Sequence, residues 1–221
     1  MIVDERIITF INSLDTKNSE ILEDIEREAL ADNVPIIRRE MQSFLKVLLM
    51  VKKPMRVLEV GTAVGFSALL MSEYVPEECA ITTIENYEKR IPIARQNFVR
   101  AGKEKKITLL EGDAMDVLKT LEGPYDFIFM DAAKGQYIHY MPEAVRLLSD
   151  GGILMSDNVL QDGDIIESRF AVERRNRTIH SRMRDYLYEL KHSDVLETSI
   201  IPLGDGVALS IKKKKEEKEN R

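Results

Sequence analysis

The chain has 221 residues, of which 44% are hydrophobic and 32% are charged, as expected for one globular domain with a continuous core. A formal net charge of −6 at pH 7 argues against a protein that coats nucleic acid through its overall charge. It does not exclude local basic patches. Cys79 is the only cysteine, which excludes an internal disulfide and favours a reducing compartment. Residues 1–15 lack the apolar segment of a signal peptide, and no stretch approaches the roughly 20 apolar residues that span a membrane. We therefore expect a cytoplasmic protein.

The N-terminal quarter has the apolar spacing of helices. In residues 4–51 the pair Asn18-Ser19 offers an N-cap for a helix, and Asn33-Val34-Pro35 interrupts the pattern before a second helix. No Gly/Ser-rich linker follows. We therefore expect residues 1–53 to be a helical extension of a single domain that spans residues 1–211.

From Pro54 onward, apolar runs that suit strands alternate with helical patterns. The expected strands are 56–60, 80–84, 106–110, 125–130 and a segment after Gly152. The expected helices are 67–74, a helix through 91–98, 114–121 and about 136–148. Five successive strand–helix units predict an α/β fold with a doubly wound, mostly parallel sheet and right-handed crossovers.

The C-terminal part departs from this alternation. Residues 169–191 are expected to form one long helix. Residues 195–202 and 207–211 are expected to be strands, joined by Leu203-Gly204-Asp205-Gly206, a sequence typical of hairpin turns. Residues 212–221 are almost all charged and are expected to form a disordered tail. An antiparallel hairpin closing a parallel sheet is not the usual dinucleotide-binding pattern.

A glycine-containing loop, residues 59–67 (EVGTAVGFS), follows the first strand and opens a helix. Its glycines permit a tight turn and close approach of the backbone to a ligand, although Ala63 breaks the G-x-G-x-x-G spacing. Glu85 ends the second strand, where an acidic side chain binds ribose hydroxyls, and Asp113 with Ala114 follows the third strand. A plain strand-to-helix turn is the alternative, but the three strand ends together indicate an adenosine-containing ligand.

Two buried-looking strands end in oxygen donors. Asp131 follows the run FIFM, and Asp157 with Asn158 follows GGILMS, while Lys134 lies within a turn of Asp131. Ligands of α/β sheets bind beyond the carboxyl ends of the strands, and an all-oxygen set suits Mg²⁺ or another hard divalent ion. Asp157 and Asn158 can share an ion only if the strand has already ended. The alternative is that these are ordinary turn-forming residues.

Five arginines lie close together in the expected C-terminal helix, where they face only two acidic residues. They are either a solvated helix face or a phosphate-binding patch, for which the guanidinium fork is well suited. The five are Arg174, Arg175, Arg177, Arg182 and Arg184. The three histidines have no metal-ligand spacing, and no Ser-His-Asp constellation or Walker loop is present.

The motifs VLEVGTAVGFSALLMS, TTIE, EGDA, FMDAAKGQY and SDNVL together resemble the class I, metal-dependent O-methyltransferases of the catechol and caffeoyl-CoA type. This resemblance implies a seven-stranded Rossmann-like sheet, S-adenosylmethionine as methyl donor, Mg²⁺ or a similar divalent cation, and a homodimer. The implied cofactor-binding residues are Met41, Glu59, Gly61, Ser67, Glu85, Asp113, Ala114 and Asp131. The implied metal ligands are Asp131, Asp157 and Asn158, with Lys134 as the catalytic residue.

Within that family, the forms DAAKGQY, DNVL, ERRNRT and PLGDG are most similar to bacterial tRNA 5-hydroxyuridine methyltransferases, which make 5-methoxyuridine at the wobble position. The resemblance implies an anticodon loop held by Arg174, Arg175, Arg177 and Arg182, with the Lys212–Lys215 run as further phosphate contacts. The competing substrate is a small catechol or caffeoyl-CoA-like ester. A nicotinamide-dependent oxidoreductase is disfavoured by the glycine spacing. A non-catalytic RNA-binding module would leave the oxygen donors and Lys134 without a role.

Overall fold

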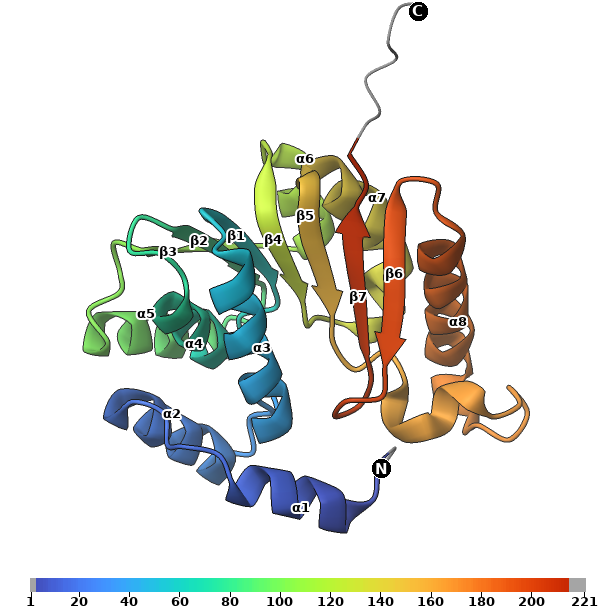
Figure 1. The fold of residues 1–221 in the computed structure, drawn as a ribbon, viewed down its shortest axis with the longest axis horizontal. Helices are drawn as coiled ribbons and strands as arrows, with labels where there is room; N and C mark the ends of the chain where they lie inside the picture. The colour runs from blue at the N-terminus through green and yellow to red at the C-terminus, as the bar shows by residue number, and fades with distance from the viewer. Residues whose placement is uncertain (1–2, 215–221) are drawn as a thin grey trace, which may run out of the picture.

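A seven-stranded sheet forms the centre of the computed structural model, which describes residues 3–214 (Figure 1). The strand order is β3-β2-β1-β4-β5-β7-β6. The first five strands are mutually parallel, while β7 is antiparallel to both β5 and β6. This confirms the predicted fold class. The strands are β1 Arg56–Val60, β2 Ala80–Glu85, β3 Ile107–Glu111, β4 Tyr125–Met130, β5 Leu148–Ser156, β6 Leu196–Ile201 and β7 Val207–Lys212.

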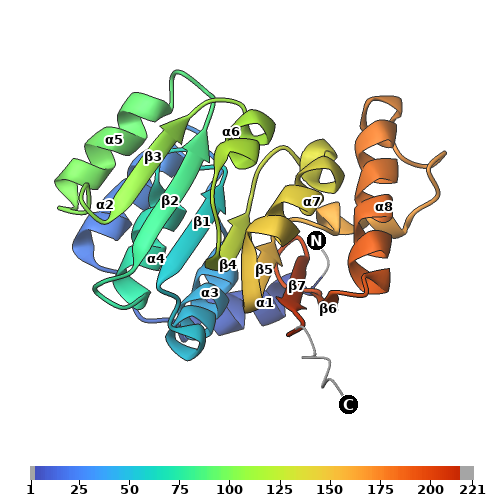
Figure 2. The same ribbon diagram turned by 90° about the horizontal axis from the view of Figure 1, so that it is seen from above.

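Both faces of the sheet are covered by helices (Figure 2). In β4, Phe127 and Phe129 face one hydrophobic core, made with α2 to α5, whereas Ile128 and Met130 face a second core, made with α6 to α8. This two-sided burial explains why the strand has no polar alternation. The helices are α1 Glu5–Ser13, α2 Glu20–Ala31, α3 Arg39–Lys52, α4 Phe66–Tyr74, α5 Ile91–Arg100, α6 Ala114–Thr120, α7 Tyr137–Leu147 and α8 Arg177–His192.

The long C-terminal helix is shorter than predicted. It begins at Arg177 rather than at residue 169, after the short 3₁₀ helices η2 Gln161–Ile166 and η3 Arg174–Asn176. Side chains of α8 hold this preceding segment in a looped path. Arg177 donates to the carbonyls of Val172 and Phe170, and Arg184 donates to that of Ile165. These bonds satisfy carbonyl groups that a continuous helix would have satisfied internally.

The hairpin runs one residue further than predicted. Lys212, assigned to the tail from its charge, belongs to β7, and its ammonium group donates to the carbonyls of Val145 and Leu148. The backbone N–H of Lys213 donates to Val195. Residues 215–221 of the predicted tail lie outside the described residues. Among residues 3–214, no helix has both the length and the apolar character needed to cross a membrane.

Candidate active site

A cavity of about 600 Å³ opens at the carboxyl ends of the parallel strands, within the size range of small-molecule sites. Its walls come from the loops after β1 to β5, from the segment between α2 and α3, and from the hairpin loop between β6 and β7. The lining residues used below are Ile36, Ile37, Arg38, Gly61, Ala63, Ser67, Glu85, Tyr87, Arg90, Gly112, Ala114, Asp131, Lys134, Asp157, Asn158 and Asp205.

The glycine loop brings two strand ends into contact. Gly61 has a φ of +104°, and a Cβ at this position would collide with the backbone carbonyl of Asp131. The backbone N–H groups of Gly61 and Thr62 both donate to the carbonyl of Ile84, each at 3.1 Å. The loop then enters α4, with Ser67 in its first turn. Only glycine permits this conformation and close approach together. The tight turn is as predicted from the motif, and the close approach is to the Asp131 backbone.

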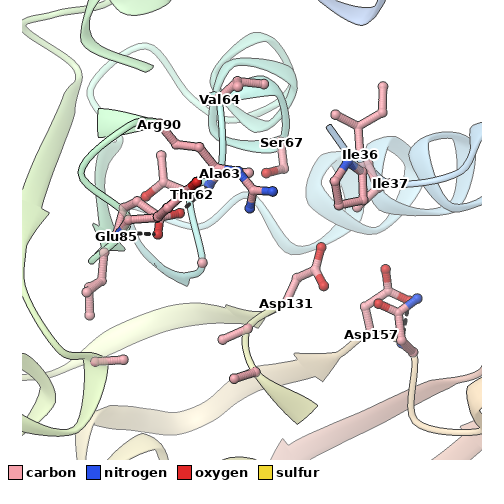
Figure 3. A pocket seen from close by; sticks show the side chains of 18 of the residues that line it. Ile36, Ile37, Thr62, Ala63, Val64, Ser67, Glu85, Arg90, Asp131 and Asp157 are labelled. Carbon is pink, nitrogen blue, oxygen red and sulfur yellow. Dashed lines mark hydrogen bonds between the residues drawn. The ribbon is translucent and has the colours of Figure 1, made fainter. Parts of the chain in front are cut away.

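Glu85 organises the glycine loop from the end of β2. Its carboxylate accepts hydrogen bonds from the backbone N–H of Ala63 at 2.7 Å, and from those of Asn86 and Tyr87 at 2.9 Å each (Figure 3). Glu85 nevertheless lines the cavity, and a carboxylate has about four lone-pair positions. It can therefore hold the loop and still accept a hydroxyl from a ligand.

Glu59 lies behind the cavity rather than in its wall. The Ser67 hydroxyl and the Thr83 hydroxyl each donate to its carboxylate at 2.5 Å, and Glu59 is completely buried. This burial raises the pKa of Glu59 to about 7 because the charged form loses its hydration. Both Ser67 and Glu59 were predicted to bind the cofactor. Ser67 lines the cavity, whereas Glu59 contacts Ser67 from behind it.

Two further predicted cofactor contacts do not line the cavity with their side chains. Met41 is 1% exposed and packs in the hydrophobic core. The Asp113 carboxylate caps α6 by accepting from the N–H of Met115, so its neighbours Gly112 and Ala114 supply the wall instead. Helical spacing could not separate a core-facing methionine from a cavity-facing one.

The oxygen donors meet at the other end of the cavity. Figure 3 shows the side chains of Asp131 and Asp157 pointing into the same space, with Ile36 and Ile37 across from them. Strand β5 ends at Ser156, and Asn158 has a left-handed backbone with a φ of +58°. The strand has therefore ended before Asp157 and Asn158, which was the condition for these two neighbouring residues to share an ion.

Burial of two neighbouring carboxyl groups is the dominant electrostatic feature of this end. Burial and the nearby Asp131 carboxylate raise the pKa of Asp157 to about 7. Burial likewise raises the pKa of Asp131, while the Lys134 ammonium opposes both shifts. Two desolvated carboxylates and an amide form a hard oxygen set that suits a divalent cation. Within the described part of the chain, no three His, Cys, Asp or Glu side chains form a metal-binding group; the third predicted donor, Asn158, is an amide.

Tyr137 holds the two donor-bearing strand ends together. Its phenol oxygen lies 3.1 Å from the carbonyls of both Met130 and Asp157, and it accepts from the N–H of Ala132 at 3.3 Å. The ring is fully buried and meets Tyr186 edge-to-face, with ring centres 5.5 Å apart. The sequence motif that ends in KGQY contains this tyrosine, but the pattern alone did not indicate its role.

The arginines of the C-terminal segment lie outside the cavity lining. Arg177, Arg182 and Arg184 donate to backbone carbonyls, Arg182 to that of Gly135. Arg175 is exposed and pairs with Glu173 at 2.7 Å. The segment is therefore partly structural, and its contact with tRNA stays a prediction.

Comparison with known proteins identifies the family of this chain. The profile of the O-methyltransferase family matches residues 12–213. Caffeoyl-CoA O-methyltransferase 2 of Populus trichocarpa is 32% identical over 180 residues, which cover 75% of this chain and 70% of that protein. A catechol O-methyltransferase of Mycobacterium tuberculosis is 37% identical over 112 residues, covering 50% of this chain and 51% of that protein.

Solved structures are similar over nearly the whole chain. The SAH-bound methyltransferase of Podospora anserina has a TM-score of 0.87 at 26% identity and covers 96% of this chain and 97% of its own. The SAH complex of a Bacillus cereus O-methyltransferase shares the fold, with a TM-score of 0.83 at 23% identity over 94% and 97% of the two chains. The chain therefore belongs to the O-methyltransferase family and is an S-adenosylmethionine-dependent O-methyltransferase.

Proposed function

We propose that this enzyme methylates one of two neighbouring oxygens of a substrate chelated by Mg²⁺ or a similar divalent cation, and that this substrate is 5-hydroxyuridine at the tRNA wobble position. The observation that carries the reaction is the meeting of Asp131, Asp157, Asn158 and Lys134 at one end of a cavity. The other end of that cavity is formed by the glycine loop and Glu85. The methyl donor and the acceptor oxygen would thus share one cavity.

S-adenosylmethionine would lie along the glycine loop. Its ribose hydroxyls would face Glu85, its adenine would lie near Ala114, and its methionine part would face Gly61 and Ser67, in keeping with the polar atoms available there. The sulfonium is positively charged, so it would be favoured beside Asp131. Because this carboxylate also points into the same space as Asp157, it would lie beside both the sulfonium and the cation.

The donor end fits a cation chemically. Asp131, Asp157 and Asn158 would hold it, because a positive charge would offset the burial that raises the pKa of both aspartates and the repulsion from Asp131 that adds to the shift of Asp157. When bound, such an ion chelates two adjacent substrate oxygens and lowers the pKa of the reacting hydroxyl. Ile36 and Ile37 would supply an apolar wall against the plane of the substrate ring.

The transfer itself is an in-line displacement. The hydroxyl loses its proton, the oxygen forms a bond to the methyl carbon, and the carbon–sulfur bond breaks with its electron pair left on the sulfur. The rate therefore depends on the alignment of oxygen, carbon and sulfur. Lys134 would act either as the general base that accepts the proton or as a charge that stabilises the oxyanion. Lys134→Arg separates these roles, because arginine keeps the charge and does not act as a base.

A 5-hydroxyuridine offers the required pair of oxygens, namely its 5-hydroxyl and the adjacent 4-carbonyl. An anticodon loop presents unstacked bases that can enter such a cavity, and this substrate would place the enzyme in the cytoplasm. The exposed Arg174 and Arg175 are suited to contact phosphates. Arg177 and Arg182 would contribute mainly by holding the segment in place, since their guanidinium groups already donate to backbone carbonyls.

A small catechol or caffeoyl-CoA-like ester is the second candidate. It is favoured by the relatives, which include caffeoyl-CoA and catechol enzymes. It carries the same pair of adjacent oxygens and needs no basic patch. The family resemblance also implies a homodimer, which sedimentation velocity would test.

The deciding experiment is mass spectrometry of nucleosides from the tRNA of a strain that lacks this gene. We expect this tRNA to lose 5-methoxyuridine and to gain 5-hydroxyuridine. The wild-type gene should restore 5-methoxyuridine, whereas a gene that encodes Asp157→Ala should not. Unchanged 5-methoxyuridine would exclude the tRNA substrate and leave the catechol-type acceptors. As a matched test in vitro, Arg174→Gln/Arg175→Gln should weaken tRNA binding and reduce its salt dependence without changing methylation of a free catechol.

A further inference from the structure

The hairpin loop between β6 and β7 is docked against the oxygen-donor end. The backbone N–H of Leu160 donates to the carbonyl of Asp205, and that of Val159 donates to Gly206, both at 2.9 Å. Gly206 has a φ of +89°, and a Cβ there would collide with the Leu160 side chain. The glycine of the turn therefore permits a close approach, which places the Asp205 side chain in the cavity wall.

Asp205 settles the orientation of the Asn158 amide. The Asn158 Nδ2 donates to Asp205 Oδ2 at 3.3 Å. Only the NH₂ side of an amide can face a carboxylate favourably, because the carbonyl side would place two acceptors together. The Asn158 Oδ1 is consequently turned away from Asp205. An asparagine that serves as a cation ligand must present this oxygen, not its NH₂ group.

Arg38 in turn holds Asp205. Its guanidinium Nη2 lies 2.7 Å from Asp205 Oδ1, the carboxylate oxygen that Asn158 does not use, and 3.4 Å from Asp162. Asp205 is only 14% exposed, so this ion pair is better shielded than a surface pair. Arg38 belongs to the segment between α2 and α3 that forms the apolar wall. A single side chain thus links the N-terminal region to the donor end.

We infer that Arg38 and Asp205 are positioning residues, which act through Asn158 to aim its amide oxygen at the cation. This inference rests on the proposed function, since it assumes the cation. It extends that function by assigning roles to two residues that lie 167 positions apart in the sequence, at 38 and 205. Outer-shell partners of this kind commonly affect metal affinity by about 10- to 100-fold.

The sign of the Arg38 effect separates positioning from simple electrostatics. Removing a positive charge beside a cation site should tighten cation binding if charge alone matters. Positioning predicts the opposite, because Asp205 loses its anchor and Asn158 loses its fixed orientation. The two explanations therefore predict opposite changes in the cation affinity of Arg38→Gln, and we expect the affinity to fall.

The experiment titrates Mn²⁺ into the full-length protein in the presence of S-adenosylhomocysteine. The electron paramagnetic resonance signal of free Mn²⁺ reports how much of the ion is bound. We expect Arg38→Gln and Asp205→Ala each to weaken Mn²⁺ binding by about tenfold or more. Arg39→Gln is the matched control. It removes the same charge at the next residue, but Arg39 pairs with Glu26 at 2.9 Å, away from Asp205. It should leave the Mn²⁺ affinity unchanged.

A double-mutant cycle tests whether Asp205 acts through Asn158. If it does, adding Asp205→Ala to Asn158→Ala should weaken Mn²⁺ binding no further. A multiplicative loss would show that Asp205 acts independently and would overturn the inference. Asp205→Asn, which keeps an oxygen acceptor for Asn158 but not the charge that holds Arg38, should show an intermediate loss. It replaces Asp205→Ala if that variant does not fold.

The remaining outcomes separate this inference from the proposed function. Tighter or unchanged Mn²⁺ binding in Arg38→Gln, with binding abolished in Asp157→Ala, would overturn the positioning role alone. No Mn²⁺ binding by the wild type would overturn the cation requirement, and the inference with it. Calorimetric affinity for S-adenosylhomocysteine and the melting temperature should stay near wild type in every variant, which would exclude a general loss of structure.

Discussion

The two ends of the cavity are built on different physical principles. At the glycine-loop end, backbone hydrogen bonds do most of the positioning, and Glu85 alone accepts three of them. At the donor end, Asp131 and Asp157 are crowded and desolvated, and the pKa of each is raised. The groups of the first end are already held by hydrogen bonds within the protein, whereas the proposed cation would complete the second. Substitutions at the two ends should therefore fail in different ways.

The largest effect is expected for Asp157→Ala. Loss of the cation should reduce turnover by about 1,000-fold or more, since the ion contributes several kcal/mol at about 1.4 kcal/mol per tenfold. Binding of S-adenosylmethionine, measured by calorimetry, should change little because the glycine-loop end is intact. Asp164→Ala, at an exposed position nearby, is the control. Near-normal turnover of Asp157→Ala would exclude the proposed mechanism.

Lys134→Ala should also nearly abolish turnover, by about 100- to 10,000-fold, because a positioned proton acceptor or charge is lost. Unlike Asp157→Ala, it should still bind Mn²⁺, since lysine donates no oxygen ligand. Single-turnover rates measured at several pH values would separate the two roles. Recovery of activity in Lys134→Arg would support oxyanion stabilisation, and continued inactivity would support proton transfer. Normal activity of the alanine variant would remove Lys134 from the mechanism.

Glu85→Gln tests the glycine-loop end by itself. An amide has one acceptor oxygen for the three N–H donors of Ala63, Asn86 and Tyr87, and it carries no charge. We expect about a tenfold or greater loss of S-adenosylmethionine affinity by calorimetry, since hydrogen bonds to charged groups contribute about 1.5–3 kcal/mol. Mn²⁺ affinity should not change. Equal losses at both ends would contradict their independence.

The smallest effect on activity is expected for Glu59→Gln, which should instead change how the stability depends on pH. The folded-state pKa of about 7 lies above the ordinary 4.5, so folding favours the protonated form. Stability is therefore lost as the pH rises from about 4.5 through 7, by up to about 3 kcal/mol at 1.36 kcal/mol per unit. Urea unfolding of the ligand-free protein should show that the free energy of unfolding falls less between pH 5 and pH 8 in Glu59→Gln than in the wild type. An identical pH dependence would contradict the buried titration.

Local sequence patterns were sufficient for the strands and for most of the cavity. Unbroken apolar runs indicated the buried strands. The glycine loop after β1, Glu85 at the end of β2, and the oxygen donors after β4 and β5 indicated the sheet edge at which the cavity lies. The pattern failed where burial could not be read from spacing. Met41 packs in the hydrophobic core, and Glu59 is buried behind Ser67. Residues 169–176 form a looped segment that ends in the short helix η3 and is held by Arg177 of α8.

The sequence by itself determined which hydrophobic segments form the strands. It also determined the oxygen donors that follow two of these strands and the glycine loop that follows the first. Only the tertiary structure decided that Asp205 faces Asn158, that Arg38 reaches Asp205, and that Tyr137 joins two strand ends. The reason is physical. Periodicity reports which face of one element is buried, whereas a contact between distant segments depends on how sheet, hairpin and N-terminal segment pack together.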